Sequence, residues 1–207
     1  MSDIPEPEKR KNKNILVQII AVVVLVIVVG AVAVVAMHPS APSRTIQPAV
    51  QPSFKFLSPS YLTVAYGMNI TSQNYTSNLT SSVYGNISTT GVEKGEMYLY
   101  GVNASSSSGV GSLDIGIAIL DLSSSSDANV SLQAFSSEMH KVNGVSITYG
   151  NVSGFRFVNV TDNSTSFPYS IYYGVYGNWV LLIEFVGQAT AHEYAIFEAQ
   201  ASLMLGS

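Results

Sequence analysis

An uninterrupted apolar run from Ile15 to Met37 limits what this chain can fold into more than any other feature of its sequence. The run contains no charged residue, and sixteen of its residues are Val, Ile or Leu. As a helix rising ~1.5 Å per residue it would reach about 35 Å, enough to cross a hydrocarbon core of ~30 Å. Unpaired backbone amides cost several kcal/mol each in lipid, so even a Val-rich segment becomes helical there. We therefore predict a transmembrane helix over residues 15–37, with the lipid bilayer as its direct partner.

The charges that flank this run predict its orientation. Lys9, Arg10, Lys11 and Lys13 come directly before it, whereas only Arg44 follows closely. Basic residues stay on the cytoplasmic side of a membrane. We expect a single-pass protein of the cell membrane, with a cytoplasmic basic tail over residues 1–14 and everything after the helix outside.

Two alternatives concern processing of the N-terminal segment. The triplet Ala31-Val32-Ala33 fits a signal-peptidase site, although the apolar cores of cleaved signals are shorter than this run. Basic residues, an apolar helix and a β-rich head also resemble archaeal type IV pilins, which are filament subunits. Those pilins are cut between Lys or Arg and a small residue, whereas Lys13 is followed here by Asn14. Five prolines between His38 and Ser60 would interrupt a continuous pilin helix, and predict instead an extended stalk over residues 38–60.

Sugar-acceptor triplets, Asn-x-Ser/Thr, are unusually dense beyond the stalk, and none lies in the basic tail. Ser- and Thr-rich loops that also use Asn in turns are the alternative explanation. Because the apolar run independently places these residues outside, we predict N-glycosylation in an extracellular domain over residues 61–207. Four triplets fall within Asn69–Ser88, which we expect to be an exposed loop. The predicted acceptors are Asn69, Asn74, Asn78, Asn86, Asn103, Asn129, Asn151, Asn159 and Asn163.

The composition of the outer part excludes several classes of function. After Pro39 there are five Lys or Arg and ten Asp or Glu, without a basic cluster, so no nucleic acid is expected as a partner. The chain has no cysteine, which excludes disulfides, Cys-ligated metals and thiol catalysis. Sparse charge, absent cysteine and many acceptor asparagines together resemble surface proteins of thermoacidophilic archaea.

Alternating apolar residues from Met97 onward predict an antiparallel sheet with two helices, an α+β fold. We expect strands at 97–102, 112–122, 145–150 and 154–160, a loop at 103–111, and a helix that Asp127 caps and Gly144 ends. Gly177-Asn178 predicts a two-residue turn that joins two strands within 168–187, with Tyr176 facing Trp179. Both faces of that hairpin are apolar, so it should lie in the middle of the sheet. The order of elements is similar to PsbP-like α/β sandwiches.

The closing helix begins with a predicted capping box, Thr190 and Glu193, and carries two nearly opposite apolar stripes. One stripe has Tyr194, Phe197, Ala201 and Leu205, and the other has Ile196, Ala199 and Leu203. A helix that is apolar on two sides is either buried or contacts a partner. We therefore predict that Ile196 and Leu203 contact another envelope or membrane protein.

Catalytic patterns are weak throughout the chain. The sequence HEYAIF starts like a zinc-protease helix but has Ile196 where the second His belongs. An extracellular hydrolase would need a pocket that gathers residues such as Glu184, Asp114, His140 and His192. Arg156 and Glu184 are expected to pair across the sheet. We assign no catalytic, cofactor or metal residue, and expect a membrane-anchored glycoprotein with a binding or scaffolding head.

Overall fold

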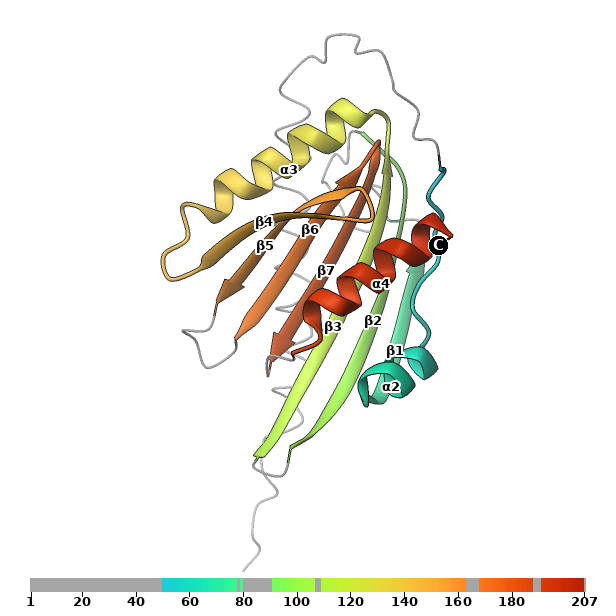
Figure 1. The fold of residues 1–207 in the computed structure, drawn as a ribbon, viewed down its shortest axis with the longest axis vertical. Coiled ribbons are helices and arrows are strands. Elements are labelled where there is room, and N and C mark those ends of the chain that lie inside the picture. The colour runs from blue at the N-terminus through green and yellow to red at the C-terminus, as the bar shows by residue number, and fades with distance from the viewer. Residues whose placement is uncertain are drawn as a thin grey trace, which may run out of the picture.

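The computed structural model describes residues 50–77, 79, 91–106, 109–162, 168–187 and 191–206. They form one seven-stranded antiparallel sheet and three helices (Figure 1). The predicted α+β class and antiparallel sheet are confirmed, but the domain has three helices instead of two. The predicted membrane helix over 15–37 lies outside the described residues. None of the helices within those residues is long and apolar enough to cross a membrane.

The strands are ordered β1-β2-β3-β7-β6-β5-β4 across the sheet. This order places β7, near the end of the sequence, in the centre, and leaves β1 and β4 as the two edges. The strands are β1 (Asn69–Ser77), β2 (Val92–Ser106), β3 (Gly109–Leu122), β4 (Ser146–Val152), β5 (Phe155–Asp162), β6 (Tyr169–Tyr176) and β7 (Trp179–Gly187).

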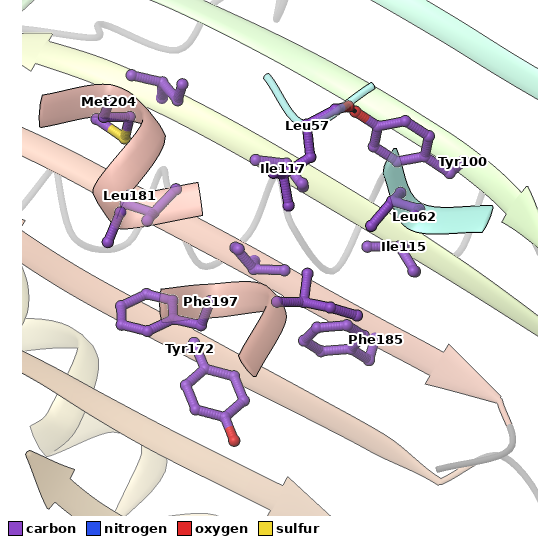
Figure 2. Packing of buried hydrophobic residues seen from close by; sticks show 14 of the residues in the cluster. Leu57, Leu62, Tyr100, Ile115, Ile117, Tyr172, Leu181, Phe185, Phe197 and Met204 are labelled. Atoms are coloured by element: carbon purple, nitrogen blue, oxygen red, sulfur yellow. Dashed lines mark hydrogen bonds between the residues drawn. The ribbon is translucent and has the colours of Figure 1, made fainter. Parts of the chain in front are cut away.

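Helices cover both faces of the sheet. Successive residues of a strand point to opposite sides, so each face has its own set of apolar side chains for a helix to cover. On one face, Leu62 of α2 (Pro59–Tyr66) and Phe197 of α4 (Glu193–Leu205) pack with Ile115 and Ile117 of β3. Figure 2 shows this cluster, with Phe197 beside Tyr172. On the other face, Phe135 of α3 (Ser125–Met139) packs with a second cluster of β-strand residues. We call these the α4 face and the α3 face.

The β6–β7 hairpin agrees with its prediction in detail. Gly177 has a φ of 59° and no non-glycine in the turn has a positive φ, as in a type II′ turn, where glycine takes the first central position. Tyr176 pairs with Trp179. The residues on each side of the hairpin join the two separate clusters, so the hairpin is buried on both faces.

Residues 50–58, which we call the strap, run along the domain instead of away from it. The Ser53 amide donates to the carbonyl oxygen of Met204 at 2.9 Å. Leu57 is buried, and its carbonyl accepts a 2.6 Å hydrogen bond from the Tyr100 hydroxyl (Figure 2). The part of the predicted stalk from residue 50 onward therefore belongs to the domain. Burial of Leu57 and its neighbours stabilises this arrangement relative to an extended chain in water.

Local predictions failed at four other places. Asn69–Ser77 is the edge strand β1, not part of a loop, and the described parts of 103–111 extend β2 and β3. Helix α3 begins earlier than predicted, because the Ser124 hydroxyl, not Asp127, caps it and accepts from the Asp127 amide at 3.1 Å. Helix α4 begins after His192, without a side-chain cap, and Thr190 of the predicted capping box lies outside the described residues.

Candidate functional site

The predicted glycosylation sites occupy different kinds of position. Asn69 and Asn74 on β1 and Asn151 on β4 are exposed. Asn129 and Asn159 are half-buried, and their side-chain oxygens accept hydrogen bonds from Arg156 and Ser170. Asn103 lies in β2, with its side chain outside the description, and Asn78, Asn86 and Asn163 lie outside the described residues altogether. The three exposed acceptors are therefore the ones best placed to carry a glycan.

The two candidate partner contacts on α4 have different surroundings. Ile196 is 0% exposed and belongs to the core on the α4 face. The domain itself thus covers this side chain and leaves no surface for another protein. Leu203 is half-buried at the edge of the same cluster, so only this member of the pair offers some surface.

The residues considered for hydrolysis are spread over the domain. His140 is exposed at the end of α3, and His192 precedes α4 on the opposite face of the sheet. Glu184 and Asp114 project on the α3 face from β7 and β3, two positions out of register with each other. Among the residues that the structure describes, no three His, Asp or Glu side chains come close enough to hold a metal ion.

Glu184 is the most unusual ionisable group in the described chain. It lies opposite Ile171 in the β6–β7 hairpin. It is 3% exposed, and its Oε2 atom has no hydrogen-bond partner. Burial therefore raises the pKa of this carboxyl from 4.5 to about 8. The expected pair with Arg156 is not formed, because Arg156 bonds to Asn129 instead.

A small hollow opens beside the first turn of α4. Its lining includes Thr161, Tyr169, Ser170, Phe185 and Glu193. The Ser170 hydroxyl donates to Asn159 at 3.1 Å. Burial, and then the charge of Glu193, raise the pKa of nearby Tyr172 to about 12. The Ser170 hydroxyl in this lining therefore bonds to an amide oxygen, which is not a general base.

Three aromatic rings meet where the strap crosses the β1 edge of the sheet, and we call them the aromatic platform. Phe56 of the strap lies 6.2 Å from Tyr75 and 5.6 Å from Tyr98, measured between ring centroids. Tyr75 and Tyr98 are register partners on β1 and β2, with centroids 5.6 Å apart. Tyr98 in turn stacks at 4.8 Å on the buried ring of Tyr100, so the platform rests on the core.

Polar groups hold the rim of the aromatic platform in place. The Tyr75 hydroxyl donates to Glu96 at 2.6 Å, and the Tyr98 hydroxyl donates to Gln73 at 3.3 Å. The bond to Glu96, followed by burial, raises the pKa of Tyr75. Glu96 is also paired with Lys94 at 2.7 Å, and the Lys94 ammonium lies 4.0 Å from the centroid of Phe54. Every charge on this rim is therefore neutralised by a neighbour.

Sequence reasoning missed the aromatic platform as a site. Phe56 lies in the predicted stalk and Tyr75 in the predicted loop, so no contact between their rings is expected from the sequence. The alternation Gln73, Tyr75 was the available signal, because two such residues in one strand share a face. It matches the alternation Tyr98, Tyr100 on the neighbouring strand.

Comparisons with known proteins show a likeness in fold alone. No protein-family model matches this chain, and no curated protein matches its sequence. Its fold resembles the crystal structure of the extracellular domain of PknH from Mycobacterium tuberculosis. That likeness covers 77% of this chain and 98% of the other, with 12% identical residues and a TM-score of 0.49. Nothing about the activity of this chain follows from it.

Proposed function

We propose that this chain is a single-pass membrane glycoprotein whose outer domain is a binding head held close to the lipid. The observation that carries the proposal is the strap. It continues the chain that follows the predicted span, and it is bonded to both β2 and α4. These bonds attach the incoming chain to the surface of the domain. Such a domain is suited to presenting a binding surface at a short distance from the membrane.

The position of the sugar acceptors supports an outward-facing domain. The exposed acceptors Asn69, Asn74 and Asn151 lie on the two edge strands, β1 and β4. Glycans there would prevent pairing with strands of other molecules, which is a common hazard for sheet edges. Binding, rather than catalysis, fits a domain whose described His and acidic side chains are dispersed. The partner we expect is another envelope or membrane protein, or an extracellular ligand.

Fractionation of cells that express the full chain tests this proposal. We expect the protein in the membrane pellet after an alkaline carbonate wash. Protease added outside intact cells should remove the domain and leave an N-terminal fragment behind. A tag at residue 1 and another at residue 207 would separate these two products.

Recovery of an unglycosylated chain in the soluble cytosolic fraction would overturn the proposal. Sequencing the mature N-terminus addresses the processing alternatives. An intact basic tail agrees with a retained anchor, whereas a mature chain that starts at Asn14 indicates a filament subunit. A chain cut after Ala33 would be a released protein and would contradict the anchor.

A further inference from the structure

The aromatic platform exposes part of one tyrosine to solvent beside further hydrogen-bonding groups. Tyr75 is 48% exposed, although its hydroxyl is tied to Glu96. Gln73 is exposed and uses its Oε1 atom to accept from Tyr98, which leaves its amide N–H groups for a ligand. The Lys94 side chain, 48% exposed, supplies further donors next to Glu96.

We infer that the aromatic platform binds a saccharide. The C–H face of a pyranose ring packs against an aromatic face, because tyrosine provides apolar area together with a polar edge. Sugar hydroxyls would accept from the Gln73 amide and the Lys94 ammonium, whereas Glu96 is buried and holds Tyr75 and Lys94 in place. The hydrogen bonds of Tyr75 and Tyr98 hold both rings before a ligand arrives, which reduces the entropy lost on binding.

The surroundings of the aromatic platform favour a saccharide over a protein partner. Among the large apolar side chains exposed in the described residues, Tyr75 is the only one that belongs to the platform. Stable protein interfaces need about 800 Å² on each partner and a cluster of apolar anchors. A flat site with one exposed ring and polar neighbours suits a small hydroxylated ligand better.

The predicted glycans on β1 would leave the aromatic platform accessible. Asn74 pairs with Leu99, whereas the next residue, Tyr75, pairs with Tyr98. Successive strand residues point to opposite faces, so Asn74 projects on the α3 face and Tyr75 on the α4 face. A glycan on Asn74 would therefore extend away from the platform.

This inference names a ligand class for the binding head and rests on the proposed function. The test is calorimetric titration of the full chain in lipid nanodiscs with maltohexaose, cellohexaose and chitohexaose in turn. We expect at least one of the three to bind. Tyr75→Ala should weaken that binding about tenfold, and Tyr75→Phe, which keeps the ring, should largely preserve it. Tyr149→Ala, at an exposed tyrosine on the far edge strand, is the control and should have no effect.

Two results would overturn the inference. One is the absence of binding by all three saccharides at millimolar concentration. The other is an equal loss of binding in Tyr75→Ala and Tyr149→Ala, with the unfolding temperature of both variants unchanged. Failure of the membrane anchor would show in fractionation instead. If fractionation shows that the full chain is soluble, the titration is carried out in buffer instead of nanodiscs. The membrane anchor and the saccharide site are therefore tested separately.

Discussion

Glu184 is a carboxyl group in surroundings that favour its neutral form. Its neighbours across the sheet are Ile171 on β6 and Gly116 on β3. The polar side chains nearest along the same face are Tyr169 on β6, Asp114 on β3 and Asp162 on β5, and none of them brings a positive charge. Nothing in this environment compensates an ionised carboxylate, so protonation is the way in which the domain tolerates Glu184.

The stability of the domain should fall as the pH rises from about 4.5 to about 8. The pKa of Glu184 is 4.5 in its unperturbed state and about 8 in the folded domain. Below pH 4.5 the group is protonated in both the folded and unfolded states, and its stabilising effect is fully present. Between the two pKa values only the folded state holds the proton, so the free energy of unfolding decreases by about 1.4 kcal/mol per pH unit. Calorimetric unfolding temperatures between pH 4 and pH 9 measure this slope.

Glu184→Gln should remove most of that pH dependence, because the amide resembles the protonated acid and does not titrate. Glu138→Gln is the matched control. Glu138 is exposed and forms only a surface ion pair with Lys141, which contributes little to stability. Equal slopes in the wild type and in Glu184→Gln would show that another group controls the transition.

At the scale of elements, the sequence was informative where burial imposed a pattern. The β6–β7 hairpin is covered on both faces, so nearly every position had to be apolar and the turn had to carry glycine. The edge strand β1 was missed for the opposite reason. Its sequence, NITSQNYTS, is exposed over most of its length, and an exposed strand needs no apolar alternation.

Sequence patterns also could not predict short elements that are held by residues far away along the chain. Helix α2 has eight residues and only Leu62 fully buried, too few for a periodic signal. The strap looks like a linker because it contains Pro52 and lies between Pro48 and Pro59. Its partners Gln200 and Met204 are about 145 residues away in the chain. The aromatic platform combines the strap with the missed edge strand β1, which explains why it was not anticipated.

Gln200→Leu should loosen the strap. Gln200 is 0% exposed, accepts from the Leu57 amide at 3.0 Å and donates to the Lys55 carbonyl at 2.7 Å. Leucine would leave both backbone groups unpaired at a cost of about 1–3 kcal/mol each. We expect a lower unfolding temperature and faster amide exchange at Lys55 and Leu57.

Gln133→Leu is the control for this substitution, because Gln133 lies exposed on α3. It should change neither the unfolding temperature nor amide exchange in the strap. Unchanged exchange in Gln200→Leu would mean that packing of Leu57 alone holds the strap.

At the scale of the whole molecule, the strap determines how far the domain can stand from lipid. If the membrane helix ends at Met37, twelve residues, 38–49, remain before the described domain begins. Fully extended, they span at most about 40 Å. The platform is therefore expected to work near the membrane surface.

Glycosylation should follow the exposure of the acceptors. In protein purified from its native membrane, glycopeptide mass spectrometry should find Asn69, Asn74 and Asn151 modified more fully than Asn129 and Asn159. The first three are exposed, whereas the side chains of the other two are half-buried and hydrogen-bonded. Asn74→Gln should remove the mass of one glycan without changing the unfolding temperature. An intact mass equal to that of the bare polypeptide would contradict this prediction.

The pairing of strap and α4 also constrains the timing of biogenesis. The strap is made early, whereas Gln200 and Met204 follow their partners in the strap by 145 and 151 residues. The centre of the sheet is likewise incomplete until β7 arrives to join β3 and β6. In the proposed membrane-anchored chain, Leu57 and the apolar strand faces would therefore stay uncovered until β7 and α4 have been made. We expect such a delay to make folding of the domain depend on chaperones during synthesis.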